Sequence, residues 1–265
     1  MTLYDQIGVG YDTTRRADPG VVGRLLDLLA VPAGGGCLDV ACGTGNYTTA
    51  LAQAGLRMIG VDVSCQMLAS ARAKPGAVRW VNGDAAALPY ADASFQAAVC
   101  TLALHHFRQP EQVFREIARV LDGGGEGGGR LVCFTADPEQ MRRYWLTTYF
   151  PDAMDQAILQ MPPLEQTLQL LAVAGFTRVA REPWSVTPEL QDLFLYAGKY
   201  RPELYFDPGV RAGISTFANL ADPIEIEQGC ARLRADLASG RFADVLRAAE
   251  HSDGDYLFLA AERSG

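Results

Sequence analysis

The feature that most constrains the fold is the stretch Leu38–Asn46, which reads LDVACGTGN. Its first residues form a short apolar run with one acid, which is typical of a buried parallel strand. Gly43 and Gly45 allow a tight turn, against which a ligand can lie close to the backbone. The residues after the turn are predicted to open a helix, with Thr44 or Asn46 as its cap. A strand, glycine turn and helix in this order mark the ligand crevice of an open α/β sheet.

A second apolar strand is predicted at Arg57–Asp62, and its last residue is an acid. Asp62 follows Gly43 by roughly the 20-residue spacing at which dinucleotide folds place a carboxylate on a ribose. The ends of adjacent parallel strands lie side by side at one edge of the sheet. A carboxylate at this position can therefore accept hydrogen bonds from both hydroxyls of a ribose.

The motifs LDVACGTG and GVDVS resemble the first two motifs of the class I S-adenosylmethionine-dependent methyltransferases. The subgroup that they resemble is the small-molecule type that includes the ubiquinone and menaquinone methyltransferases. The resemblance covers residues 5–135 with specific motifs and continues more weakly to the C-terminus. It implies S-adenosylmethionine as the cofactor and a small molecule as the methyl acceptor. The chain departs from the family at Ala41, where the first glycine of the family's acid-x-Gly-x-Gly-x-Gly pattern usually stands.

The resemblance also implies roles for individual residues in cofactor binding. Asp62 would hold the ribose, and Asp84 with the amide of Ala85 would hold the adenine. Asp39 would orient the glycine turn and the methionine ammonium, while Arg15 would bind the methionine carboxylate. The full set implied for cofactor binding is Tyr11, Arg15, Asp39, Ala41, Gly43, Thr44, Gly45, Asp62, Val63, Met67, Asp84, Ala85, Thr101 and Leu102.

Some of these residues have an alternative, purely structural interpretation. The family places Tyr11 near the sulfonium or the acceptor, yet the segment around Tyr11 and Arg15 also fits a solvated N-terminal arm. Met67 often packs on the adenine in the family, but it equally suits the core of the helix that Ser64 is predicted to cap.

Two adjacent histidines follow the fourth predicted strand, Phe95–Cys100. The segment Leu104–Phe107 reads LHHF and resembles the family's signature after this strand. Imidazole titrates near neutrality, so His105 or His106 is a candidate to take a proton from the acceptor. The alternative is that both histidines only hold the loop, because methyl transfer often needs no more than alignment.

The remaining pattern predicts an α/β fold with a Rossmann-like, seven-stranded and mostly parallel sheet. In the family the last strand, here Asp255–Ala261, is antiparallel and lies between the fifth and sixth strands. The other strands are expected at Val78–Asn82, at Arg130–Thr135 and at Phe176–Val186, where Pro183 is expected to interrupt the pairing.

Two helical segments rich in aromatic residues, 137–161 and 187–250, are additional to this minimal fold. We expect a core at 1–136, which includes the N-terminal arm, and the rest of the core sheet at 162–186 and 251–265. The two additional segments are expected to form a cap over the acceptor pocket. Their aromatic side chains either bind the acceptor or form the cap's own core.

The composition argues against several classes of partner. The net charge is −8, and no basic cluster with interleaved aromatic residues indicates nucleic-acid binding. No apolar run is long enough to span a membrane and no secretory leader is recognisable, so a cytoplasmic protein is expected. The glycine-rich segment 123–129 is expected to be a flexible connection.

Six cysteines are present without a CxxC pair, and we expect reduced, mostly buried thiols and no metal site. The alternative for these cysteines is a thiol site that converges on the acceptor pocket, as in arsenite methyltransferases.

Two other functions stay open at this point. A nicotinamide-dependent oxidoreductase would share the strand, turn, helix and Asp62. In that class, however, the third glycine of GxGxxG would fall at Thr48, and Asp39 and Asp84 would have no role. A protein that binds the cofactor without methyl transfer is the second alternative, because no diagnostic nucleophile marks the acceptor pocket.

Overall fold

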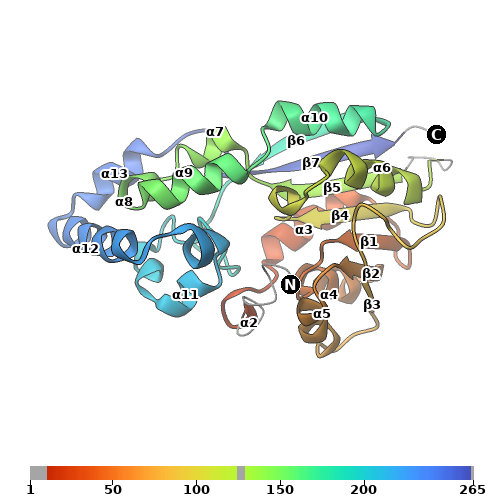
Figure 1. The fold of residues 1–265 in the computed structure, drawn as a ribbon, viewed down its shortest axis with the longest axis horizontal. Coiled ribbons are helices and arrows are strands. Elements are labelled where there is room, and N and C mark those ends of the chain that lie inside the picture. The colour runs from red at the N-terminus through yellow and green to blue at the C-terminus, as the bar shows by residue number, and fades with distance from the viewer. Residues whose placement is uncertain (1–10, 124–128, 264–265) are drawn as a thin grey trace.

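The computed structural model describes residues 11–123 and 129–263, with Tyr11 described by its backbone alone. At its centre is a seven-stranded sheet with the order β3-β2-β1-β4-β5-β7-β6 (Figure 1). The strands are β1 (Gly36–Val40), β2 (Arg57–Asp62), β3 (Arg79–Asn82), β4 (Ala97–Thr101), β5 (Gly129–Thr135), β6 (Phe176–Trp184) and β7 (Tyr256–Arg263). β1 to β5 pair in parallel, and β7 runs antiparallel between β5 and β6. The predicted fold class and the place of the last strand are confirmed.

Two strands differ in detail from the expectation. β4 begins at Ala97, and Phe95 forms only an isolated bridge with Leu121. β6 is not interrupted at Pro183, which stays in register with Leu257 of β7. Since β6 is the edge strand, the missing N–H of the proline is tolerated there. The expectation for the glycine-rich connection falls largely on residues 124–128, which lie outside the described residues.

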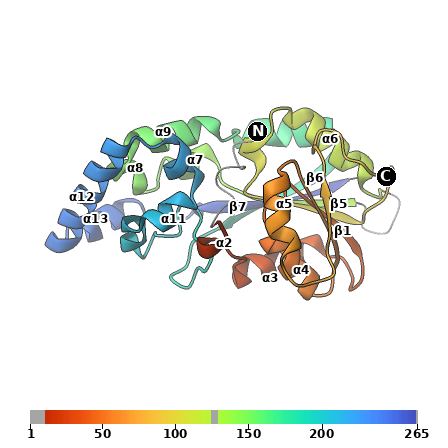
Figure 2. The same cartoon turned by 60° about the horizontal axis from the view of Figure 1, so that its bottom comes forward.

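Helices cover both faces of the sheet (Figures 1 and 2). α3 (Pro19–Leu29) packs against β4 and β5 and contacts α4 (Asn46–Gln53). On the opposite face α6 (Pro110–Val120) packs against α10 (Leu164–Val173). α5 (Cys65–Arg72) contacts β2 and β3. Each face of the sheet thus has its own buried apolar cluster, which fixes the strand ends that carry the site.

The starts of these helices follow from capping, with one correction. Ser64 caps α5 as predicted, because its side chain accepts a hydrogen bond from the Met67 amide at 3.2 Å. The predicted side-chain cap of α4 is wrong. The N-cap residue of α4 is Gly45, with φ +73° and no side-chain cap bond. The side chains of Thr44 and Asn46 are instead hydrogen-bonded to Asp12.

Glycine is needed at the turn for packing as well as for its backbone conformation. A Cβ atom built on Gly45 would lie 2.1 Å from the ring of Trp80, and one on Gly60 would lie 2.5 Å from it. The indole of Trp80 therefore packs against the backbone of the glycine turn and of β2 at once. This contact fixes the height of the turn above the sheet.

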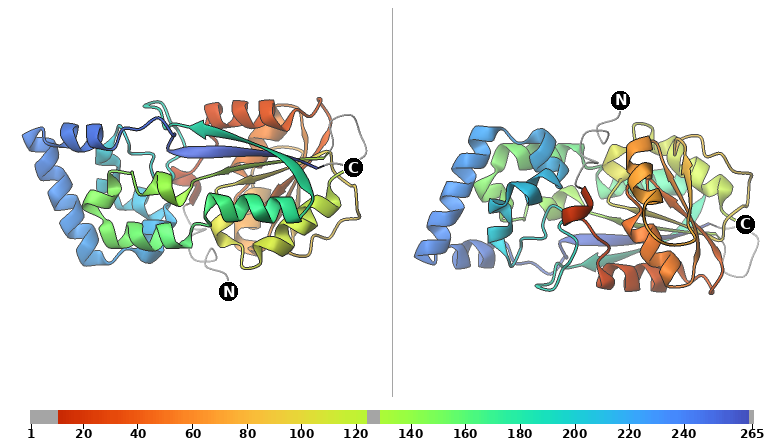
Figure 3. Two further views of the ribbon diagram at one scale, coloured as in Figure 1. Left: turned by 90° about the horizontal axis from the view of Figure 1, so that it is seen from above. Right: turned by 90° about the horizontal axis from the view of Figure 1, so that it is seen from below.

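A group of helices lies beyond the carboxyl ends of the parallel strands, and we call it the cap (Figures 1 and 3). Its elements are α7 (Pro138–Met141), α8 (Leu146–Tyr149), α9 (Pro151–Gln160), η2 (Pro202–Phe206), α11 (Pro208–Ala212), η3 (Thr216–Leu220), α12 (Pro223–Ser239) and α13 (Phe242–Ala248). Its centre is aromatic. Trp145 is 1% exposed and meets the ring of Phe242 edge-on at 5.0 Å, while Tyr144 stacks on Tyr196 at 4.0 Å. Most cap aromatics therefore form the cap's own core.

A buried ion pair joins the cap to the sheet. Lys199 Nζ lies 2.9 Å from both carboxylate oxygens of Asp255, which directly precedes β7, and both residues are buried. The same carboxylate accepts the amide of Val186 at 2.8 Å. With its charge paired and its lone pairs used, Asp255 can stay buried at the junction.

In the part of the chain that the structure describes, no helix has the length and apolar character of a membrane span.

Candidate cofactor and acceptor site

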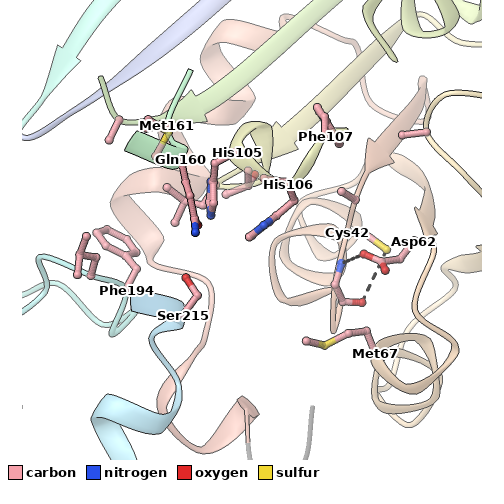
Figure 4. Close-up of a pocket in the computed structure, with 18 of the residues that line it drawn as sticks. Cys42, Asp62, Met67, His105, His106, Phe107, Gln160, Met161, Phe194 and Ser215 are labelled. Carbon is pink, nitrogen blue, oxygen red and sulfur yellow. Dashed lines mark hydrogen bonds between the residues drawn. The ribbon is translucent and has the colours of Figure 1, made fainter. Parts of the chain in front are cut away.

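A cavity of about 810 Å³ lies at the carboxyl ends of the parallel strands, between the sheet and the cap (Figure 4). Most of the residues singled out from the sequence line it. They are Arg15, Asp39, Ala41, Gly43, Thr44, Asp62, Val63, Met67, Asp84, Ala85, Thr101, Leu102, His105 and His106. Gly45 does not line this cavity, because it is buried against Trp80 below the turn. The side chain of Tyr11 lies outside the described part of the structure.

The glycine turn presents an open backbone surface to this cavity. Ala41, Gly43 and Gly45 all have positive φ, at 58°, 54° and 73°. The left-handed conformation at Ala41 costs roughly 1–2 kcal/mol, which explains why a glycine usually stands there in the family. A Cβ built on Gly43 would meet no atom within 4 Å, so the space above Gly43 is free for a ligand.

Asp62 joins the ends of the first two strands. Its Oδ2 accepts the Gly43 amide at 2.8 Å, and its Oδ1 accepts the Ser64 amide at 2.8 Å (Figure 4). These bonds orient the carboxylate toward the cavity, and each oxygen has a further lone pair. The geometry fits a group that binds a ribose diol.

Asp39 is a buried carboxylate with only one of its oxygens satisfied. Thr48 Oγ1 donates to Asp39 Oδ2 at 2.6 Å, whereas Oδ1 is buried without a hydrogen-bond partner. Burial, with a smaller contribution from the charge of nearby Asp62, raises the pKa of Asp39 to about 7. A cationic donor in the cavity would satisfy the free oxygen and favour the ionised form. The residues present thus fit the ammonium of the predicted cofactor.

The end of β4 contributes a strained backbone and a second unsatisfied oxygen. Leu102 has φ +53°, although it is not glycine, and its amide donates to the carbonyl of Phe134 at 2.7 Å. Thr101 Oγ1 is buried without a partner. Strain of this kind, of order 1–3 kcal/mol, persists where the surroundings fix a functional conformation.

The described part of the N-terminal arm is held at the glycine turn by hydrogen bonds and an ion pair of Asp12, in contrast to the solvated arm that was one alternative. The helix α2 (Tyr11–Thr14) carries Asp12, and Thr44 Oγ1 donates to its Oδ1 at 2.6 Å. Lys74 Nζ lies 2.8 Å from the other oxygen of Asp12. Nothing in the sequence around Asp12 marked it for this role, since its partners lie far along the chain.

Arg15 lines the cavity, but its guanidinium already forms an ion pair with Asp192 of the cap. Its Nε lies 2.6 Å from Asp192 Oδ1, and Tyr47 donates its hydroxyl to Asp192 Oδ2 at 3.1 Å. Asp192 is only 1% exposed, so this ion pair is largely removed from water. Any bond from Arg15 to a cofactor carboxylate would share the guanidinium with Asp192.

The two histidine rings lie close together in the cavity and are tilted by 50° to each other. Their ring centroids are 3.7 Å apart, and both side chains point into the cavity (Figure 4). Burial lowers the pKa of His105 to about 4 and that of His106 to about 3. Both imidazoles are therefore neutral at pH 7, below the range that the sequence argument assumed. His105 Nδ1 has no hydrogen-bond partner.

The adenine end of the cavity is more open. Met67 is 2% exposed, belongs to the buried face of α5 and also lines the cavity. Its packing on the adenine stays a prediction. Asp84 is exposed, and its Oδ1 accepts the Ala86 amide at 2.9 Å. This bond holds the turn after β3 at the cavity wall.

The cap supplies cavity residues that the sequence did not reveal. The side chain of Gln160 lies beside His105, and Phe194 and Ser215 lie on another part of the cavity wall (Figure 4). They come from three separate places in the cap and form no motif, so only the tertiary structure brings them together.

The alternative of a cysteine site is not supported by the geometry. All six cysteines are free, and Cys42 is the only one that lines the cavity among the described residues. Burial raises the pKa of the Cys42 thiol well above its ordinary value. Within residues 11–123 and 129–263, no group of three metal-binding side chains comes together.

Comparison with known proteins places these features in a family. A family model described as a methyltransferase domain matches residues 38–127. The demethylmenaquinone methyltransferase of Roseiflexus castenholzii is 31% identical over 206 residues, which cover 67% of this chain and 84% of that protein. The demethylmenaquinone methyltransferase of Renibacterium salmoninarum is 32% identical, and the match spans 47% of this chain and 54% of that protein.

A solved structure is similar over almost the whole chain. It is described as a candidate methyltransferase from an antibiotic biosynthesis pathway of Anabaena variabilis, with 34% identity and a TM-score of 0.83. The match covers 94% of this chain and 98% of that one, so it includes the cap as well as the sheet. None of these three proteins is named as a nicotinamide-dependent enzyme.

Proposed function

Because this chain belongs to the class I S-adenosylmethionine-dependent methyltransferases, we propose that it methylates a small molecule held between the histidines and the cap. The observation that carries the proposal is that the core and the cap line one and the same cavity. Asp39 and Asp62 line it from the core, and Phe194 and Ser215 line it from the cap. The division of the chain into a core (1–136, 162–186, 251–265) and a cap (137–161, 187–250) is part of this proposal.

The chain's own residues would bind and orient the cofactor. S-adenosylmethionine supplies an electrophilic methyl group on a sulfonium when it is bound. Asp62 would accept the ribose hydroxyls, Asp39 the methionine ammonium and Asp84 the adenine amino group. The open backbone at Gly43 would let the cofactor lie against the turn. The family role of Tyr11 and the share of Arg15 in binding the carboxylate belong to the same proposal.

The rest of the work is alignment and exclusion of water. The cap closes one side of the cavity, and the histidines border the space in which the acceptor would lie. Holding two reactants in line is by itself a large part of the rate enhancement of a displacement. If the acceptor loses a proton, His105 Nδ1 is an unpaired atom that can receive it.

The relatives give a starting point for the acceptor. Two are named as demethylmenaquinone methyltransferases, which supports a small molecule as the acceptor of this chain. A cytoplasmic location is also proposed, supported by the free state of all six cysteines.

The test combines binding and turnover. Isothermal titration with S-adenosylhomocysteine should show one site per chain, whereas NAD should give no heat of binding. Incubation with S-adenosylmethionine and a panel of small-molecule acceptors should then release S-adenosylhomocysteine. Binding of NAD in place of S-adenosylhomocysteine would refute the proposal. Cofactor binding without turnover on any acceptor would favour the protein that binds without methyl transfer.

A further inference from the structure

Lysine is rare in this chain, and one of its two lysines lies beside the glycine turn. Among the 23 lysine and arginine residues only Lys74 and Lys199 are lysines. Lys199 pairs with Asp255 at the junction of the cap and the sheet. Lys74 stands in the bend between α5 and β3, where Pro75 prevents the helix from continuing. Its side chain is 20% exposed, so the ammonium is partly removed from water.

The ammonium of Lys74 bridges two oxygen atoms that belong to different segments. Its Nζ donates to the carbonyl oxygen of Thr44 in the glycine turn at 2.5 Å and lies 2.8 Å from Asp12 Oδ2 in α2. A carboxylate and a carbonyl oxygen repel each other when no cation lies between them. Lysine suits this position, because its compact ammonium has three donors and can serve both acceptors at once.

The other oxygen of Asp12 completes the contact between the N-terminal arm and the turn. Oδ1 accepts hydrogen bonds from Thr44 Oγ1 at 2.6 Å and from Asn46 Nδ2 at 3.0 Å. Asn46 Nδ2 also donates to the carbonyl of Arg15 at 3.0 Å. Thr44 is therefore held at its hydroxyl and at its carbonyl, within a connected network rather than a single surface ion pair.

The network fixes part of the cavity wall without facing the cavity itself. Thr44, Asn46 and Arg15 line the cavity. Lys74 and Asp12 are not lining residues, so they would act on a ligand there only through their neighbours. Because the Thr44 carbonyl belongs to the turn against which the cofactor is proposed to lie, the orientation of its peptide sets the shape of that surface.

We propose that Lys74 is a positioning residue for the cofactor, and that its ammonium sets the distance between the N-terminal arm and the glycine turn. The inference rests on the proposed function and deepens it. Without the cation, the carboxylate of Asp12 faces the carbonyl of Thr44, so the arm and the turn move apart. The arm stays tied to the cap, because Arg15 Nε lies 2.6 Å from Asp192. Loss of the ammonium therefore changes the cavity wall more than the overall fold.

The experiment titrates S-adenosylhomocysteine into the unmodified protein and three variants. Lys74→Met removes the ammonium and should weaken binding about tenfold, because a charged hydrogen-bond donor is lost from the network. Lys74→Arg keeps a cation with several donors, so its affinity should stay within about threefold of the unmodified protein. Arg72→Met removes an exposed cation at the end of α5, away from the cavity lining, and should leave the affinity unchanged.

The melting temperature separates positioning from general stability. In the absence of ligand it should differ by less than about 3 °C between Lys74→Met and the unmodified protein, since a partly exposed ion pair contributes little to stability. A loss of affinity without a loss of stability is the signature of a positioning role.

A second substitution tests the repulsion that the inference assumes. Asp12→Asn removes the carboxylate charge that Lys74→Met leaves unpaired. The double variant Asp12→Asn/Lys74→Met should therefore bind S-adenosylhomocysteine more tightly than Lys74→Met alone, because the two residues act through one contact.

Three results would overturn the inference. They are unchanged affinity in Lys74→Met, an equal loss in Arg72→Met, and a double variant whose loss is the sum of the two single losses. No binding of S-adenosylhomocysteine by the unmodified protein would refute the proposed function itself, so the two failures are distinguishable.

Discussion

The buried carboxylate of Asp39 leads to the sharpest prediction, a dependence of cofactor affinity on pH near neutrality. The pKa of Asp39 in the ligand-free protein is about 7, with burial as the main cause. If only the ionised carboxylate binds the methionine ammonium, the apparent affinity scales with the ionised fraction. S-adenosylhomocysteine should then bind about tenfold more weakly at pH 6 than at pH 8, and about 100-fold more weakly at pH 5.

The assay is isothermal titration with S-adenosylhomocysteine from pH 5 to pH 8. The matched ligand is 5′-methylthioadenosine, which keeps the adenosine but lacks the amino acid, and its affinity should show no such slope. The Thr48 hydroxyl donates a hydrogen bond to Asp39 and thereby lowers the pKa of that carboxyl. Thr48→Val removes this hydroxyl, so the pKa of Asp39 should rise. This variant should therefore move the inflection to higher pH. An affinity for S-adenosylhomocysteine that is constant over this range would refute the reasoning.

The same residue predicts opposite effects on stability and on binding. The raised pKa means that the folded protein binds more protons than the unfolded chain between about pH 4 and pH 7. Stability in the absence of ligand should therefore fall as the pH rises through this window. Asp39→Asn removes the buried charge, so it should unfold no more easily than the wild type at pH 8 in urea. It should nevertheless bind S-adenosylhomocysteine as weakly as the wild type does in acid.

Three further predictions follow from single contacts. Asp62→Ala should weaken S-adenosylhomocysteine binding by about 1–3 kcal/mol in a titration, because the ribose loses a charged partner; unchanged affinity would remove Asp62 from the site. Gly60→Ala should destabilise the protein by about 1–3 kcal/mol in urea unfolding, because the added methyl would lie 2.5 Å from Trp80. Gly23→Ala, within α3 and with no atom near the added methyl, should stabilise the protein by about 0.5–1 kcal/mol. Equal effects of the two substitutions would contradict the packing argument. At saturating cofactor, kcat should show no inflection between pH 6 and pH 8 from the histidines, since their pKa values lie near 3 to 4. An inflection near pH 6.5 that His105→Gln abolishes would contradict the prediction.

Local patterns in the sequence determined the sheet and the glycine turn. A buried strand, two glycines and an acid at the next strand end are all encoded by neighbouring residues, and a parallel sheet brings such strand ends together. The cap of α5 by Ser64 followed from the same kind of pattern. The place of β7 between β5 and β6 was instead implied by the resemblance to the family. The strand, the turn and the cap need no knowledge of distant contacts.

Tertiary structure alone decided how the site is closed and charged. Asp12 meets Thr44 and Lys74, and Arg15 meets Asp192, across long stretches of chain that share no periodic pattern. The pKa values of the histidines depend on burial by groups that no local motif specifies. For the same reason the cap residues that line the cavity, among them Gln160, Phe194 and Ser215, could be identified only from the cap folded against the sheet.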